Sequence, residues 1–232
     1  DLQFVSWVLS QFSSIDQVKE ALDGVTVVSV SVGGDSSTVH WRIGEKSGRQ
    51  VVLEFIDGKA VFYENPVGVL TNGPSFNWHL TNLSNYINIY PGAAKDNEWG
   101  DYMLTPISGG SGALGLPGDM TSPSRFVRIA YFKATAPQLA TSYKTVMQCF
   151  HILNNFDIPI GVEHPLGEAP DVPSATPCTT VSDLSGLKLY YRTTYNSNIR
   201  CIDLVSIDFS SVKYEFHPLD ARLEQPVEMV KF

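Results

Sequence analysis

Cysteine is scarce in this chain, which holds three among 232 residues, none of them in a C-x-x-C pair. An odd number argues against a disulfide framework, and the wide spacing argues against a zinc site with thiolate ligands. We therefore expect Cys149, Cys178 and Cys201 to be small apolar core residues. Nothing else in the sequence calls for a cofactor or a metal ion.

Long apolar runs and basic runs are also missing. No stretch of about 18 apolar residues occurs, so no membrane span is expected. The net charge is −8 and no Lys/Arg run is present, so the chain is not expected to bind nucleic acid. The opening residues after Asp1 lack the basic region and cleavage site of a signal peptide, and this start resembles the interior of a longer protein.

Hydrophobic residues make up 43% of the chain, enough for a sizeable core. The patterns predict helices, then strands, then helices, then strands, which two antiparallel sheets with helices outside would satisfy. Helices are expected at 2–12, 15–22, from 76, from 122 and at 136–155, and strands at 25–32, 39–43, 51–56, 60–63, 68–71, 178–181, 187–192, 199–204 and 212–216. No internal repeat or linker is evident, so a single domain is expected over residues 1–232.

A loop rich in glycine and proline fills residues 90–120 and is predicted to have little regular structure. Its glycines invite comparison with a phosphate-binding loop. No Gly-Lys-Ser/Thr sequence follows them, so nucleotide binding is not favoured. Loops of this length usually carry function or make contacts.

Asn72 stands at a break between two patterned segments. An apolar run leads to it, Gly73 and Pro74 follow, and Ser75 is a plausible N-cap. The helix after it is predicted to bury one face, formed by Phe76, Leu80, Leu83 and Ile87. On position alone Asn72 is either a rigid hydrogen-bond donor or simply a cap of its own turn.

Arg125 falls in the first turn of a helix predicted to start at Ser122 and Pro123. A cation there opposes the helix dipole, so this arginine needs a partner elsewhere.

Three motifs resemble the choloylglycine hydrolase family, which includes bile salt hydrolases and penicillin V acylases. They are VLTNGPSFNWHLTNLSNY at 69–86, LPGDMTSPSRFVR at 116–128 and TVSDL at 180–184. The similarity runs from about Trp7 to the C-terminus. The sequence WHLTNL resembles the Gram-negative, penicillin-acylase-like branch of the family. A periplasmic location is expected only by analogy with that branch.

The resemblance implies an α+β fold of four layers, αββα, typical of N-terminal nucleophile hydrolases. It implies cleavage of a linear amide C–N bond by the thiol of an N-terminal Cys, with the α-amino group as base. Asn72 matches the family's oxyanion donor, and Arg125 matches its active-site arginine, whose charge favours a thiolate. Trp78 and His79 are expected to pack in the core, and Asp119 is expected to form a turn or a cap. Asn82 is expected to have a structural role. The loop at residues 33–37 is expected to lie beside the acyl pocket.

The Cys nucleophile has no counterpart here, because none of the three cysteines could carry a free α-amine. The missing N-terminal segment is expected to supply the Cys and several strands, and without it a sheet would have an open apolar edge.

The loop at 86–116 overlaps the family's assembly segment, which implies a homotetramer. Penicillin V, conjugated bile salts and acyl-homoserine lactones all stay open as substrates. Alternatives are a non-catalytic remnant that binds an amphipathic ligand or a protein partner, and a fragment with no folded state of its own.

Overall fold

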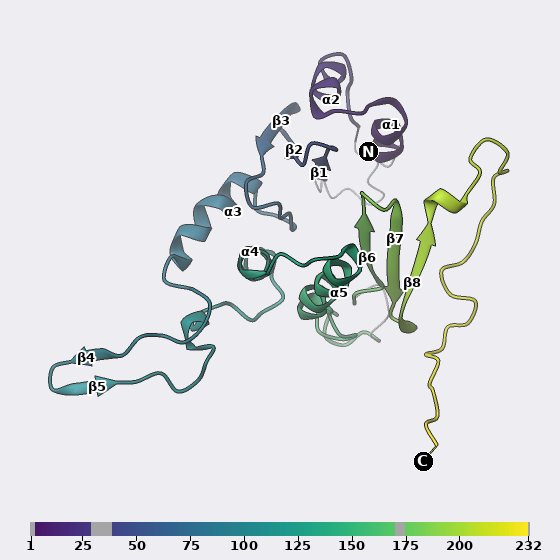
Figure 1. Cartoon of the computed structure of the whole chain (residues 1–232). Helices are drawn as coiled ribbons and strands as arrows, with labels where there is room; N and C mark the ends of the chain where they lie inside the picture. The colour runs from purple at the N-terminus through teal and green to yellow at the C-terminus, as the bar shows by residue number, and fades with distance from the viewer. Residues whose placement is uncertain (1–2, 29–38, 170–174, 232) are drawn as a thin grey trace. The chain divides into compact units, whose positions relative to one another are not determined.

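A computed structural model describes residues 3–28, 39–169 and 175–231 of the chain (Figure 1). The chain divides into two compact units, residues 1–135 (unit 1) and 136–232 (unit 2). The single domain over 1–232 stays a prediction. Within the described ranges, no helix has both the length and the apolar character needed to cross a membrane.

Unit 1 is built from helices that flank a three-stranded antiparallel sheet, with a separate hairpin. Its elements are α1 (Phe4–Gln11), α2 (Ile15–Leu22), β1 (Trp41–Gly44), β2 (Gln50–Ile56), β3 (Lys59–Glu64), α3 (Phe76–Asn82), the 3-10 turn Leu83–Tyr86, β4 (Asn97–Trp99), β5 (Tyr102–Leu104), the 3-10 turn Ser111–Ala113 and α4 (Ser122–Thr135).

Local sequence signals fix several of these elements. The Ser14 side chain accepts from the backbone N–H of Gln17 and caps α2. Asp57 and Gly58 have φ of 50° and 75°, the left-handed pair that a two-residue hairpin turn needs, and they join β2 to β3. These two features are therefore encoded within a few residues of where they occur.

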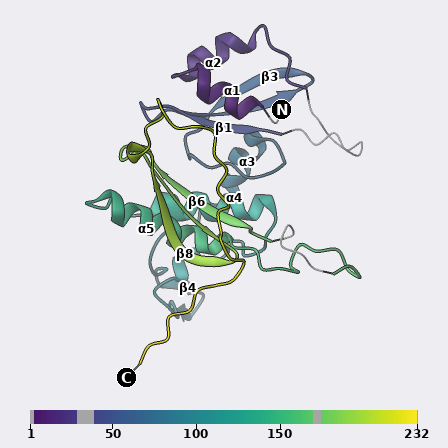
Figure 2. The ribbon, with the colours of Figure 1, turned by 90° about the vertical axis from the view of Figure 1, so that its right-hand side faces the viewer.

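Both faces of the β1–β2–β3 sheet are covered by helices (Figure 2). Leu53 packs on one face with Phe4 and Val18, from α1 and α2. Val52 packs on the other face with Phe76 and Phe126, from α3 and α4. The central strand β2 is thus buried from both sides, which gives α3 and α4 a rigid base.

The long loop contains more regular structure than predicted. β4 and β5 pair as an antiparallel hairpin that projects from the rest of unit 1 (Figure 1). Trp99, Tyr102 and Met103 on this hairpin are exposed. The alternating pattern was too short, three residues a strand, to stand out among the surrounding glycines and prolines.

Unit 2 is a helix beside a second antiparallel sheet, in the order β6–β7–β8. Its elements are α5 (Ser142–Leu153), the 3-10 turn Asn154–Phe156, β6 (Cys178–Asp183), β7 (Lys188–Thr193), β8 (Asn196–Asp203) and the 3-10 turn Leu204–Ser206. A turn joins β6 to β7, and in it Asp183 Oδ1 accepts from the N–H groups of Ser185 and Gly186.

Several predicted elements are wrong. Residues 212–216 form no strand, because their alternating apolar side chains find no partner strand in the described part of unit 2. Residues 68–71 are irregular as well, since the buried Asn65 bonds the backbone of Gly68 and Val69 in place of a neighbouring strand. Residues 136–141 are not helical, and Thr141 caps α5 instead.

The N-terminal strand and the end of the α3 helix also differ from prediction. Residues 25–28 are not a strand, and 29–32 lie outside the described residues, as does the loop 33–37. The predicted apolar face of the helix is confirmed for Phe76, Leu80 and Leu83, which pack in the core. Ile87 is 84% exposed, because the chain tightens into a 3-10 turn after Asn82 and rotates the next side chains off that face.

Candidate active site

Asn72 lies in the bend between β3 and α3, directly before a cis Gly73–Pro74 peptide bond. Its backbone carbonyl accepts two hydrogen bonds, from His79 Nε2 at 2.9 Å and from Ser122 Oγ at 2.8 Å. One of these donors lies on α3 and the other at the start of α4. The position of Asn72 is therefore set by both helices, and not by a strand end as predicted.

Arg125 lies in the first turn of α4, which begins at Ser122. Its Nη2 donates to Asn72 Oδ1 at 2.7 Å, and its Nε donates to the carbonyl of Met120 at 2.9 Å. These acceptors are the partners that a cation at this unfavourable end of the helix requires. The two site residues predicted from the sequence are thus in direct contact.

This contact fixes which way the Asn72 amide points. A guanidinium can only donate, so the Asn72 atom facing Arg125 must be the carbonyl oxygen. The Nδ2 group then points away from Arg125, and no hydrogen bond to an acceptor in the described residues occupies it. The arrangement leaves an oriented N–H donor, held by a cation, at the surface of unit 1.

His79 supports the same bend from inside. It is 1% exposed, and its ring stacks on Phe126 with centroids 4.6 Å apart and an interplanar angle of 9°. Burial lowers the pKa of His79 below its usual value of 6.5, so the ring is neutral near pH 7. Because the carbonyl of Asn72 can only accept, Nε2 carries the single ring hydrogen.

Asp119 organises the loop that leads into α4, in the turn role expected from the sequence. Its carboxylate accepts from the Thr121 N–H and from the hydroxyls of Thr121 and Ser124. The Ser124 hydroxyl, followed by the Thr121 groups, lowers the pKa of Asp119 to about 2. Arg128 donates to the backbone carbonyls of Pro117 and Asp119 and so fixes the same loop.

The low pKa of Asp119 predicts a defined acid sensitivity. A carboxyl whose pKa is lower in the folded than in the unfolded state stabilises the fold above its usual value, here 3.8. That contribution is lost as the pH falls through about 2. In an Asp119→Asn variant, we expect the fall in unfolding free energy between pH 4 and pH 2 to be shallower than in the wild type, as measured by urea unfolding. An identical slope would show that Asp119 is not bonded in this way.

A cavity of about 220 Å³ adjoins the bend. Gly73, Pro74 and Ser75 form one side of it, and His40 and Glu54 line it as well. Ser75 occupies the predicted N-cap position of α3, but its side chain makes no capping bond. The first N–H of the helix goes instead to the carboxylate of Glu54, at 2.7 Å.

Glu54 was not predicted from the sequence to belong to the site, and His79 was expected only to pack in the core. The available signal for Glu54 was a lone carboxylate within the apolar strand 51–56. Of the two residues expected in the core, His79 is buried as predicted, whereas Trp78 is 43% exposed because it lies on the outer side of α3. Asn82 bonds only to Asn85 in the described part of the chain, which fits the structural role expected for it.

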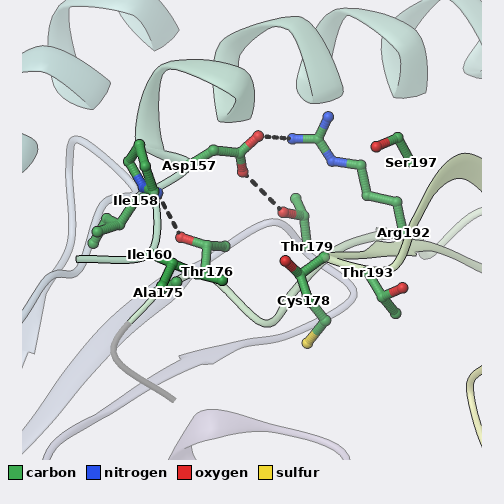
Figure 3. Close-up of a pocket in the computed structure, with 12 residues that line it drawn as sticks. Asp157, Ile158, Ile160, Ala175, Thr176, Cys178, Thr179, Arg192, Thr193 and Ser197 are labelled. Carbon is green, nitrogen blue, oxygen red and sulfur yellow. Dashed lines mark hydrogen bonds and ion pairs between the residues drawn. The ribbon is translucent and has the colours of Figure 1, made fainter. Parts of the chain in front are cut away.

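A separate pocket of about 250 Å³ lies in unit 2 (Figure 3). Arg192 points along one wall and pairs with Asp157 at 2.7 Å, so its charge is neutralised within the pocket. Thr176 and Thr179 add hydroxyls to the same lining. None of the residues predicted for the site belongs to this pocket, and its lining offers no uncompensated charge.

The cysteines are less buried than predicted. Cys149 in α5 is half-buried, and burial raises the pKa of its thiol. Cys178 and Cys201 are exposed, because they lie on β6 and β8, the two outer strands of a sheet that is only partly covered. In the described residues no three His, Cys, Asp or Glu side chains converge as metal ligands.

The chain is similar to known proteins over most of its length. Residues 1–215 match the family of linear amide C–N hydrolases known as the choloylglycine hydrolase family. A bile salt hydrolase/transferase of Clostridium perfringens is 34% identical over 203 residues, covering 87% of this chain and 61% of that protein. A penicillin V acylase of Pectobacterium atrosepticum is 26% identical, covering 89% of this chain and 53% of that protein.

A solved structure is also similar. The conjugated bile acid hydrolase from Clostridium perfringens superposes with a TM-score of 0.80 and 30% identity, over 99% of this chain and 69% of that one. The chain thus spans between half and two thirds of the length of the curated relatives described above. By its match over residues 1–215, the chain belongs to the choloylglycine hydrolase family of linear amide C–N hydrolases.

Proposed function

We propose that this chain is the part of a linear amide C–N hydrolase that stabilises the oxyanion, with Asn72 as the donor and Arg125 as its orienting cation. The observation that carries the proposal is the 2.7 Å bond from Arg125 Nη2 to Asn72 Oδ1. It leaves the Asn72 Nδ2–H group directed outward, as a donor to a developing oxyanion must be. The positive charge of Arg125 beside this donor favours both the oxyanion and an attacking thiolate.

The nucleophile of the proposed reaction is an N-terminal Cys contributed from outside these 232 residues. Cys149, Cys178 and Cys201 are internal, so their backbone nitrogens are amides and cannot accept a proton. In the proposed reaction the α-amine of the N-terminal Cys takes the thiol proton, and the sulfur attacks the carbonyl carbon of the substrate amide. The proton then passes to the leaving amine as the C–N bond breaks, and water hydrolyses the thioester to release the acid.

Conjugated bile salts are the proposed substrate class. The support is the higher identity to the bile salt hydrolase/transferase, 34%, than to the penicillin V acylase, 26%. The kinship with the Gram-negative branch stays a prediction. The complete protein is proposed to adopt the four-layer αββα fold; in support, each unit has a three-stranded antiparallel sheet, with several helices in unit 1 and α5 in unit 2.

Intact mass spectrometry of the active protein, combined with hydrolysis assays, tests this function. We expect a Cys-initiated segment to be present with this sequence, and conjugated bile salts to be cleaved faster than penicillin V or acyl-homoserine lactones. Full amidase activity from a species of 25.5 kDa alone would refute the proposal. Loss of all three activities with the Cys segment present would favour the non-catalytic alternative, a remnant that binds an amphipathic ligand or a protein partner.

The β4–β5 hairpin is proposed as an assembly element of a homotetramer. Its support is the exposed aromatic pair Trp99 and Tyr102, which are 71% and 70% exposed and lie directly opposite each other. Exposed aromatic clusters on monomers commonly mark protein contacts.

Replacing both aromatic residues of the hairpin with aspartate should therefore dissociate the assembly. We expect Trp99→Asp with Tyr102→Asp to lower the mass measured by size exclusion with light scattering, because a buried charge at a contact is unfavourable. Leu166→Asp, at a fully exposed position of unit 2, serves as the matched control and should leave the mass unchanged. A tetramer in the double variant would rule out the hairpin as an assembly element.

A further inference from the structure

The bend that carries Asn72 is held at both ends by buried side chains. At one end His79 Nε2 donates to the Asn72 carbonyl at 2.9 Å. At the other end Glu54 Oε1 accepts from the Phe76 N–H at 2.7 Å. His79 is 1% exposed and Glu54 is 6% exposed, so both supporting side chains are buried.

The burial of the Glu54 carboxylate is energetically unfavourable. It lies on β2 directly after Val51, Val52 and Leu53, all of which are fully buried. Burying a carboxylate costs several kcal/mol unless strong hydrogen bonds compensate it. Its Oε2 makes no hydrogen bond within the described residues, and His40 Nδ1 lies 3.6 Å from Oε1. The bond to the Phe76 N–H is therefore the main interaction that a carboxylate makes here and an apolar side chain could not.

His79 is equally specific. Its stack on Phe126 could be made by a phenylalanine, but the hydrogen bond to Asn72 could not. Its other nitrogen, Nδ1, makes no hydrogen bond within the described residues. Within the described residues, the hydrogen bond of the ring is therefore the one that supports the Asn72 carbonyl.

We propose that His79 and Glu54 are positioning residues that clamp the two ends of segment 72–76 and thereby hold the Asn72 amide in its donating geometry. This inference rests on the proposed role of Asn72 in oxyanion stabilisation. Misplacing a catalytic group by about 1 Å can cost on the order of 100-fold in rate. The clamp acts on the transition state through Asn72, so its loss lowers kcat and leaves KM nearly unchanged.

His79→Phe and His79→Gln separate the hydrogen bond from packing. The phenylalanine keeps the aromatic stack and removes the donor, and we expect kcat to fall about tenfold to 100-fold in the complete protein. Glutamine can place an N–H near the position of Nε2, so it should restore most of that loss. A kcat for His79→Phe within about twofold of wild type would overturn the role of His79.

A double-mutant cycle shows whether His79 acts through Asn72. In an Asn72→Ala background, His79→Phe should lower kcat no further, because the group that it positions is already gone. An undiminished second loss would overturn the proposal. Val18→Ala, in the core on the other face of the sheet, is the matched control for destabilisation and should leave kcat unchanged.

Glu54→Gln and Glu54→Leu test the other end of the clamp. Glutamine keeps an acceptor for the Phe76 N–H, and leucine removes it, so only Glu54→Leu should lower kcat and speed hydrogen exchange of the Phe76 amide. Equal exchange rates of the Phe76 amide in the two variants would overturn the clamp. This measurement does not depend on His79→Phe, so it tests the proposal even if that variant fails to fold. If Asn72→Ala keeps wild-type turnover, the proposed function fails, and the clamp is judged on hydrogen exchange alone.

Discussion

Replacing Asn72 with alanine in the complete protein is expected to lower kcat by about 100- to 1000-fold, equivalent to about 3 to 4 kcal/mol of transition-state stabilisation. The lost group is the Nδ2–H donor, which Arg125 holds in one orientation through Oδ1. In the proposed role this donor bonds more strongly to an oxyanion than to the substrate carbonyl, so we expect the loss to fall on kcat rather than KM. Steady-state kinetics with a conjugated bile salt measures it.

The fold should survive this substitution nearly intact. The Asn72 side chain is exposed, and its removal deletes one hydrogen bond to Arg125, worth about 1 kcal/mol. Asn82→Ala is the matched control, since Asn82 is an asparagine at the end of the neighbouring helix α3 and its side chain bonds only to Asn85 in the described residues. We expect the control to turn over at the wild-type rate. Wild-type turnover in Asn72→Ala as well would contradict the assignment of the oxyanion donor.

Replacing Phe126 with alanine is expected to cost about 3 to 5 kcal/mol of unfolding free energy. Phe126 is fully buried, meets Phe76 edge-on with centroids 6.1 Å apart, and stacks on His79. The cavity left behind would lie among residues of α3, α4 and β2, which cannot all move inward. Urea unfolding followed by circular dichroism measures the loss.

Phe216→Ala provides the matched control for this core substitution. Phe216 is 81% exposed in an extended segment, so its truncation removes little buried surface and should change stability by less than about 0.5 kcal/mol. A loss for Phe126→Ala no larger than that of the control would mean that α4 does not pack on the sheet as described.

Elements with local signals were predictable from the sequence. The helix Ile15–Leu22 has both its cap and its apolar periodicity within ten residues, and the Asp57-Gly58 turn is set by two. Elements that depend on distant partners were not. Residues 212–216 alternate like a strand, yet a strand exists only where another backbone is available to pair with it.

The site was predictable only in part, for the same physical reason. The position of Asn72 favoured a turn cap and left its chemistry open, and the resemblance of its motif to known hydrolases was needed to pair it with Arg125. Glu54 is 22 residues from Phe76 in the chain, so no local pattern could reveal that it supplies the first hydrogen-bond acceptor of α3. Burial and long-range hydrogen bonds belong to the packed fold, not to any window of sequence.

The location of the nucleophile is the most direct test of the proposed function. Active protein should be treated with a thiol-alkylating reagent, and the residue whose modification parallels loss of bile salt hydrolysis should be mapped by mass spectrometry. We expect that residue to be a chain-initial Cys outside these 232 residues, while labelling of the exposed Cys178 and Cys201 leaves activity unchanged. Inactivation that follows labelling of Cys149, Cys178 or Cys201 would contradict the proposed division of the active site.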